Sequence, residues 1–213
     1  FNLVRGVSEI ARISYTRQKQ ALGLGHAIYQ AKDFVGDEPF AVLLADDVVD
    51  AEKPALKQMI EVFEKYNAPV IATMQVEGEA ISRFGVIDAE EVEPNVFKIK
   101  DMVEKPAYKD APSDLAIIGR YILTPDIFGA IETTEKGSGG EIQITDAMRD
   151  LLKTRDFYAV KLEGTRHDAG GAGGARPHAH VRGRGRTRGR DRCRGRHHPS
   201  RIQGGHRDDA RAW

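Results

Sequence analysis

RQKQALGLGHA at residues 17–27 and FAVLLADD at residues 40–47 decide the fold of this chain. The first segment places a glycine turn before a helical pattern, and the second is an apolar strand that ends in Asp46 and Asp47. Ligands of open α/β sheets bind beyond the carboxyl ends of the strands. Carboxylates at that place are positioned to hold a divalent metal against phosphates, which indicates nucleotide chemistry.

Strands and helices alternate along the first part of the sequence, and strands then cluster. Apolar periodicity predicts strands at residues 12–16, 39–45, 69–76, 84–88, 95–100, 115–123 and 157–162. It predicts helices at residues 24–35, from Pro54 through Tyr66, from Thr124-Pro125 onward, and at about 142–153. The order predicts an α/β, Rossmann-like domain with a mixed, mostly parallel sheet and an antiparallel insertion. We expect the run at 39–45 to be a buried parallel strand, and Leu56, Met59, Ile60 and Phe63 to form one apolar stripe.

The zero net charge of the 213 residues averages two unlike segments, 1–170 and 171–213. The second segment holds 12 Arg and 3 Asp and has no Lys, Glu, Leu, Phe, Tyr, Asn or Met. Subtracting these from the 32 basic and 32 acidic residues leaves 20 basic and 29 acidic residues in the first segment, a net charge of −9. We therefore expect a globular domain over 1–170 and a disordered or frame-shifted tail over 171–213, which lacks the apolar residues of a core.

Cysteine and hydropathy exclude several protein classes. Cys193 is the single cysteine, so a disulfide framework and a cysteine-based metal site are excluded. No apolar run reaches the length of a membrane span, and no signal peptide is visible, so we expect a cytoplasmic protein without a membrane partner. The first residue is Phe1 rather than Met, which suggests a fragment.

Several side chains have both a functional and an ordinary interpretation. Asp46 either holds a metal or starts a loop, and its place near the strand makes it the better ligand of the acidic pair. Gln18 can read a nucleobase edge or lie on the surface, and Gly23 can approach a ligand or simply turn the chain. Glu104-Lys105 can hold sugar hydroxyls and a phosphate, or form a surface ion pair. Asp168 follows the strand at 157–162 and could share the metal.

Seven blocks in this order resemble the bacterial UTP–glucose-1-phosphate uridylyltransferases, also called UDP-glucose pyrophosphorylases. Together they span about residues 17–170. The blocks are Arg17-Gln18 with Gly23–Ala27, Leu44–Asp47, Phe84–Asp88, Val103–Pro106, Leu115–Tyr121, Gly140–Ala147 and His167–Gly170.

The resemblance implies a nucleotidyltransferase that uses Mg²⁺ and forms UDP-glucose and pyrophosphate from UTP and glucose 1-phosphate. It implies that Gln18 and Gly23 contact uracil and that Asp46 and Asp168 bind Mg²⁺. It further implies that Gly85 and Glu104 contact glucose, and that Lys105 binds its phosphate as the catalytic cation. Such transfer depends on positioning and charge neutralisation rather than on a side-chain nucleophile. A related pyrophosphorylase that uses dTTP is the alternative within this class.

Three departures from the family pattern lead us to expect that this chain itself is inactive. The N-terminal strand with its Gly-x-Gly-Thr-Arg triphosphate loop, and a lysine-containing segment downstream of it, have no counterpart here. Without that strand a sheet edge would be exposed. Asp114 stands where the family usually has Asn. After Gly170, the helical region that contributes to subunit contacts in a homo-oligomeric family gives way to the Arg-rich tail.

The tail itself has two interpretations. Clustered Arg and Gly can neutralise nucleic-acid phosphates, which would make the chain a non-catalytic remnant that binds RNA or DNA. Trp213 is its single aromatic residue, whereas interleaved aromatics would strengthen that interpretation. The abrupt start directly after an intact motif favours a frame-shifted translation of GC-rich DNA, so we do not expect a nucleic-acid partner.

Overall fold

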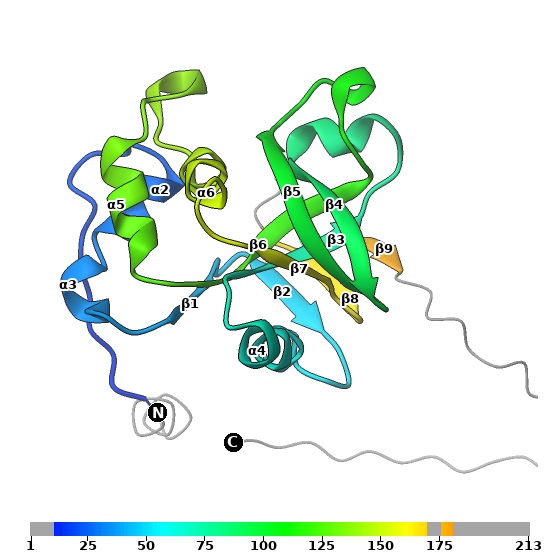
Figure 1. The fold of residues 1–213 in the computed structure, drawn as a ribbon, viewed down its shortest axis with the longest axis horizontal. Coiled ribbons are helices and arrows are strands. Elements are labelled where there is room, and N and C mark those ends of the chain that lie inside the picture. The colour runs from blue at the N-terminus through cyan, green and yellow to red at the C-terminus, as the bar shows by residue number, and fades with distance from the viewer. Residues whose placement is uncertain (1–10, 170–175, 181–213) are drawn as a thin grey trace, which may run out of the picture. The chain divides into compact units, whose positions relative to one another are not determined.

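A six-stranded mixed sheet forms the centre of the fold (Figure 1). The structure is a computed structural model that describes residues 11–169 and 176–180, all within a unit that spans residues 1–183. The strand order is β1-β6-β3-β7-β5-β4. The strands are β1 Phe40–Leu43, β3 Val70–Gln75, β4 Gly85–Glu93, β5 Val96–Glu104, β6 Leu115–Leu123 and β7 Tyr158–Lys161.

A second, three-stranded sheet contains β2, β8 and β9, in that order. Its strands are β2 Asp47–Asp50, β8 Thr165–Asp168 and β9 Arg176–His180. The helices are α2 Leu24–Tyr29, α3 Lys32–Val35, α4 Ala55–Tyr66, α5 Asp126–Thr133 and α6 Ile144–Leu152, with 3₁₀ turns η1 Gly78–Arg83, η2 Tyr108–Asp110 and η3 Ser138–Gly140. Of the predicted tail, residues 176–180 form β9, and the other residues lie outside the described part of the chain.

The two faces of the central sheet each bury a hydrophobic core. Helices α2, α5 and α6 cover one face and α4 covers the other (Figure 1). Within β6, Leu115 and Ile117 join the first core, whereas Ala116 and Ile118 join the second. Because successive side chains of a strand point to opposite faces, a strand covered on both sides is apolar throughout. This explains the continuous apolar runs in the sequence.

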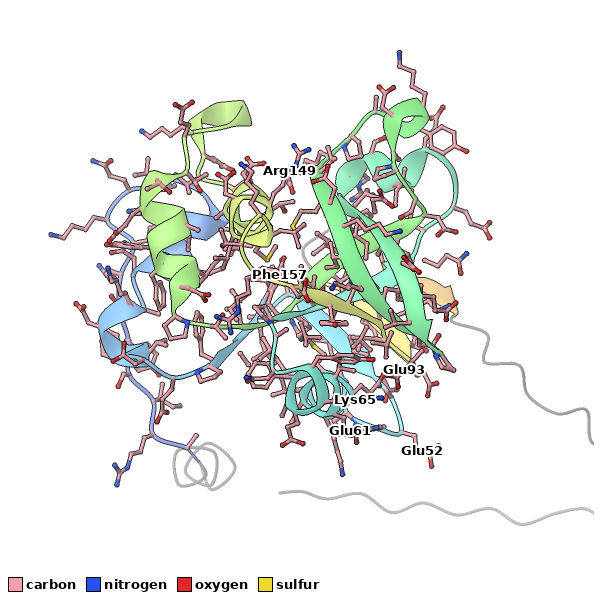
Figure 2. All side chains as sticks on the ribbon, in the orientation of Figure 1. Glu52, Glu61, Lys65, Glu93, Arg149 and Phe157 are labelled. Atoms are coloured by element: carbon pink, nitrogen blue, oxygen red, sulfur yellow. The ribbon has the colours of Figure 1, made fainter. Side chains whose placement is uncertain are left out.

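Side-chain contacts fasten the covering helices to the sheet (Figure 2). Arg149 of α6 makes a two-pronged ion pair with Asp101 of β5, at 2.6 and 2.7 Å. Lys65 near the end of α4 lies 2.5 Å from Glu93 at the end of β4. Phe157, directly before β7, is fully buried in the first core. The ion pairs Arg149–Asp101 and Lys65–Glu93 are exposed. Burial of the apolar faces therefore stabilises the layers more than these charges do.

The predicted mixed α/β class is confirmed, but the strand directions differ from the prediction. β3 and β7 are the one parallel pair among the described strands, whereas β6 is antiparallel to β1, β3 and β4. The run predicted as a buried parallel strand is β1, a half-exposed strand at the edge of the described sheet. A parallel pair needs a long crossover, whereas β4 and β5 join through a tight hairpin.

Other local expectations are wrong for identifiable reasons. Residues 12–16 form no strand, and Ile13 and Tyr15 are exposed rather than packed against a neighbour. The helix expected at 24–35 is interrupted between α2 and α3, which leaves Phe34 exposed. In α4, Leu56, Met59 and Phe63 of the predicted stripe pack on the second core, whereas Ile60 is exposed. The buried residues of the helix are Ala55, Gln58, Met59 and Val62.

Candidate active site

A cavity of about 200 Å³ opens where the end of β1, the middle of β6, the β4–β5 hairpin base and the start of α6 meet. Strand β8 closes it from the second sheet. Its lining is a mixture of carboxylates, two arginines, small backbone positions and apolar side chains. The lining residues are Leu24, Leu44, Asp46, Asp47, Arg83, Phe84, Gly85, Glu104, Ile117, Ile118, Gly119, Tyr121, Gln143, Ile144, Thr145, Arg166 and Asp168.

The adjacent carboxylates Asp46 and Asp47 lie in opposite environments. Asp46 is exposed in the turn between β1 and β2. Asp47 is 3% exposed and accepts hydrogen bonds from Arg166 Nε at 2.7 Å and from the Gly119 backbone N–H at 3.0 Å. The buried Asp47 carboxylate of β2 therefore links this strand to β6 and β8 by hydrogen bonds, whereas the exposed Asp46 carboxylate can contact a ligand.

Asp46 and Asp168 face the cavity from neighbouring strand ends. Asp168 pairs in register with Asp47, and the Ala169 N–H donates to the Asp46 carbonyl at 2.8 Å. Arg166 Nη2 donates to Asp168 Oδ2 at 3.4 Å. Two carboxylates beside an open cavity match the way Mg²⁺ is bound with waters and substrate phosphates. The described residues contain no cage of three or more His, Cys, Asp or Glu side chains.

Arg166 is the buried cation of the site. Its side chain is 10% exposed, and its guanidinium lies 5.7 Å from the centre of the Phe84 ring. Nη1 is buried and has no hydrogen-bond partner among the described residues. A buried guanidinium normally has all of its donors satisfied, so this atom leaves a donor for an oxygen-rich ligand.

Glu104 and Gly85 lie together at the base of the β4–β5 hairpin, opposite each other in register. Thr145 of α6 donates its hydroxyl to Glu104 Oε2 at 2.7 Å. A Cβ added at Gly85 would lie 3.1 Å from the Thr145 hydroxyl and 3.2 Å from Glu104 Oε2. Because Gly85 has no side chain, the space beside the Glu104 carboxylate stays open. A polar ligand can therefore approach a carboxylate that Thr145 already orients.

Lys105 stands at the rim rather than in the cavity. Its ammonium lies 3.4 Å from Glu104 Oε1 and its side chain is 58% exposed. The residue adopts a left-handed backbone conformation, with φ 46°, and its N–H donates to the Phe84 carbonyl at 3.0 Å. The backbone is therefore held in place, whereas the exposed ammonium can exchange its ion pair with Glu104 for a contact with a ligand.

Gln18 and Gly23 are outside the cavity lining but next to it, since Leu24 is part of the lining. Gln18 Nε2 donates to the Gly23 carbonyl at 3.0 Å. Gly23 adopts φ 94° and lies against the backbone of Ile142, whose N–H donates to the Leu22 carbonyl at 2.7 Å. The glycine turn therefore packs on the segment that leads into α6.

Burial raises the pKa of two groups near Glu104. The pKa of Asp146 is raised mainly by desolvation and then by the charge of Glu104. The pKa of Tyr121, which is buried in the lining, is also raised mainly by desolvation, with smaller contributions from Glu104 and Asp47. A further negative charge is therefore disfavoured beside Glu104. A cation or a hydrogen-bond donor of a ligand would stabilise the Glu104 carboxylate.

The structure brings together Asp46, Gly85, Glu104 and Asp168 in one cavity. Sequence reasoning missed Arg166, which donates to Asp47 and Asp168, and Thr145, which donates to Glu104. Arg166 could have been found from its spacing, because residues two apart in a strand share a face and Asp168 was a candidate ligand. Thr145 offered no such local signal, since its partner lies 41 residues away.

Comparison with known proteins assigns this chain to a family. The sequence profile described as "Nucleotidyl transferase" matches residues 3–172. The chain therefore belongs to the nucleotidyl transferase family, which confirms the class expected from the sequence. Within that family it is similar to proteins named UTP–glucose-1-phosphate uridylyltransferase.

Two relatives illustrate the similarity. A UTP–glucose-1-phosphate uridylyltransferase from Pseudomonas aeruginosa is 50% identical over 173 residues, which cover 80% of this chain and 62% of the relative. UTP–glucose-1-phosphate uridylyltransferase 2 from Staphylococcus saprophyticus is 48% identical over 167 residues, 78% of this chain and 58% of the relative. The chain thus spans about three-fifths of the length of these curated relatives.

Solved structures agree with the sequence comparison. A UDP-glucose pyrophosphorylase crystallised with UDP-glucose is 47% identical, with a TM-score of 0.75 over 78% of this chain and 64% of that one. A UTP-bound UDP-glucose pyrophosphorylase from Acinetobacter baumannii is 32% identical, with a TM-score of 0.68 over 78% and 60% of the two chains. Within the described residues, no helix is both long and apolar enough to cross a membrane.

Proposed function

We propose that this chain carries the substrate-binding part of an enzyme that forms UDP-glucose and pyrophosphate from UTP and glucose 1-phosphate. The observation that carries the proposal is the single cavity that gathers Asp46, Asp168, Gly85 and Glu104. Its lining includes the strand-end carboxylates Asp46 and Asp168, and Glu104, which is held by Thr145 beside Gly85. UTP is proposed rather than dTTP because the relatives described above are named for UTP.

Asp46 and Asp168 are proposed to hold Mg²⁺, since carboxylates at strand ends that line an open cavity provide the hard oxygen ligands that this ion takes. When bound, the ion would neutralise charge on the nucleotide phosphates. Arg166 donates to Asp168 through Nη2, and its buried Nη1 has no hydrogen-bond partner among the described residues. Asp47 is not proposed as a ligand, because its carboxylate already accepts from Arg166 and Gly119.

Glu104 and Gly85 are proposed to bind glucose, and Lys105 to bind its phosphate. Thr145 holds the Glu104 carboxylate in place, so the carboxylate can accept hydrogen bonds from sugar hydroxyls without first being ordered. A phosphate oxygen of glucose 1-phosphate would attack the α-phosphorus of UTP, and the bond from that phosphorus to the pyrophosphate oxygen would break. Lys105 would draw the attacking phosphate into line, and Gln18 and Gly23 are proposed to contact the uracil.

Binding without turnover is the result we expect for the 213-residue chain alone. Arg83 and Arg166 are the cations among the residues that line the cavity, and Arg166 is already paired with Asp47 and Asp168. This leaves little positive charge for a departing pyrophosphate. We also propose a cytoplasmic location, supported by the single cysteine of the chain, and a homo-oligomeric parent enzyme.

Glu104→Gln is expected to weaken binding of UDP-glucose by about tenfold or more, because the hydrogen bonds to a charged acceptor are lost. Isothermal titration calorimetry on the 213-residue chain measures this. Glu61→Gln on α4, whose side chain is 50% exposed and remote from the cavity lining, is the control and should bind as the unaltered chain does. Equal affinities for the two variants would contradict the proposed glucose site.

Removal of Mg²⁺ by chelation is expected to weaken UDP-glucose binding, because phosphate charge then faces two carboxylates. Asp46→Asn should make the affinity nearly independent of Mg²⁺, since one of the two carboxylates that hold the ion has lost its charge. Asp33→Asn on α3, outside the cavity lining, is the matched control and should retain the dependence. An unchanged dependence on Mg²⁺ in Asp46→Asn would remove Asp46 from the proposed metal site.

A further inference from the structure

His26 is held against Gln18 by a contact that the proposed function does not use. The Gln18 amide nitrogen lies 2.9 Å from His26 Nδ1 and 3.0 Å from the Gly23 carbonyl oxygen. Gln18 belongs to a segment without regular secondary structure, so no helix or strand directs its side chain. The two contacts, both from the start of α2, therefore decide which way the amide faces.

The Gly23 carbonyl determines which amide atom is which. A carbonyl oxygen only accepts, so the atom 3.0 Å from it must be the amide nitrogen rather than the oxygen. The same nitrogen has one further hydrogen, which points to Nδ1 at 2.9 Å. Nδ1 can accept it only when it carries no proton of its own, so the imidazole proton lies on Nε2.

Gln30 lies on the opposite side of the imidazole. Its amide nitrogen lies 3.3 Å from His26 Nε2 and donates to the His26 backbone carbonyl at 3.4 Å. Both contacts are longer than the 2.9 Å contact between Gln18 and Nδ1, so the Gln18 side determines the tautomer. His26 therefore accepts at Nδ1 and carries its proton on Nε2.

We propose that His26 is a positioning residue that makes Gln18 present only a hydrogen-bond acceptor to the nucleobase, and thereby selects bases with an imide N–H. Both amide hydrogens are used within the protein, which leaves Oε1 for the ligand. Uracil and thymine carry N3–H and can donate to this oxygen. Cytosine has an unprotonated N3, which accepts, and two acceptors repel. This inference rests on the proposed function, in which Gln18 contacts the base.

Loss of His26 would change what Gln18 offers. Without the imidazole, only the Gly23 carbonyl holds the amide, so turning the amide to donate to cytosine N3 costs one hydrogen bond rather than two. Discrimination between the two pyrimidines should therefore fall, while binding of the sugar and phosphates should be kept. Asn at position 26 can restore the acceptor, because its Oδ1 is attached to Cγ as Nδ1 is.

The test compares the affinities of the 213-residue chain for UDP-glucose and CDP-glucose by isothermal titration calorimetry. We expect the unaltered chain to prefer UDP-glucose by about tenfold or more, since an unpaired acceptor at the base is costly. His26→Ala should reduce the preference to about twofold, and His26→Asn should restore most of it. Gln30→Ala, which removes the contact on the other ring nitrogen, should retain the preference.

A measurement without ligand tests the geometry independently. Long-range ¹H–¹⁵N correlation spectra of the ligand-free chain should show His26 protonated on Nε2, and a proton on Nδ1 would overturn the inference. A chain that prefers UDP-glucose, and in which His26→Ala keeps that preference, would overturn the inference and leave the proposed function intact. Should neither nucleotide sugar bind, the proposed function fails and the inference falls with it.

Discussion

Asp47→Ala is expected to lower the free energy of unfolding by about 3–5 kcal/mol, the cost of leaving one partner of a buried ion pair alone. The Asp47 side chain is 5% exposed and that of Arg166 is 10% exposed. The substitution would leave the Arg166 Nε and the Gly119 N–H without their acceptor, and both groups are buried. Since domains are stable by about 5–15 kcal/mol, this loss would unfold a large fraction of the chain at moderate urea.

The neighbouring residue provides the matched control for this experiment. Asp46→Ala removes an exposed carboxylate and keeps the backbone hydrogen bond from Ala169, so its effect on stability should stay within about 0.5 kcal/mol. Urea unfolding followed by far-ultraviolet circular dichroism compares the two variants. A double variant, Asp47→Leu with Arg166→Met, should recover part of the loss, because an apolar pair leaves no buried charge. Equal unfolding midpoints for Asp46→Ala and Asp47→Ala would refute the assignment of opposite roles.

The same pair shows where sequence reasoning reaches its limit. The apolar run before Asp46 and Asp47 was enough to predict a strand that ends at the site, because that signal is local. The difference between the two carboxylates is set by Arg166, which lies 119 residues further along the chain from Asp47. Adjacent residues of one type carry no local signal of such a distant partner. The prediction favoured Asp46 because it is nearer the strand, whereas the structure distinguishes the two residues by burial.

Strand directions were harder to predict than strand positions for a related reason. The run at residues 115–123 was predicted with the bounds that β6 has, since both faces of that strand are covered and its residues are apolar. Its antiparallel pairing with β1 and β3 depends on the path of the chain between the strands. Hydrophobic periodicity reports burial and not direction, so a mostly parallel sheet could not be distinguished from the mixed sheet observed.

Gly23→Ala is expected to destabilise the chain by about 3 kcal/mol or more, through two effects that act together. Gly23 has φ 94° and ψ 173°, a conformation that residues with a Cβ rarely adopt. A Cβ there would also lie 2.7 Å from the Ile142 carbonyl oxygen and 2.8 Å from Glu141 Cβ. The Ile142 backbone cannot shift away without a cost in free energy, since its carbonyl also accepts a hydrogen bond from the Gly25 N–H at 2.9 Å.

Two other glycines separate these effects in the same urea experiment. Gly78→Ala tests the backbone conformation alone, because φ is 67° and nothing lies within 4 Å of the added Cβ, so about 1 kcal/mol is expected. Gly25→Ala tests the close approach alone, because its φ is not positive and the added Cβ would lie 2.8 Å from the Ile142 carbonyl, so about 1–3 kcal/mol is expected. A cost for Gly23→Ala no larger than that for Gly78→Ala would show that the contact with Ile142 is not restrictive.

The position of this contact gives the substitution a functional consequence as well. Ile142 leads directly into α6, and Thr145 in the first turn of α6 holds Glu104 at 2.7 Å. The Gly23 carbonyl also accepts the Gln18 amide. A Cβ that pushes the glycine turn away from Ile142 would therefore disturb the proposed base contact and the proposed sugar contact together. UDP-glucose affinity should fall by more in Gly23→Ala than in Gly25→Ala, whose own carbonyl has no such role, when both are measured under conditions in which they are folded.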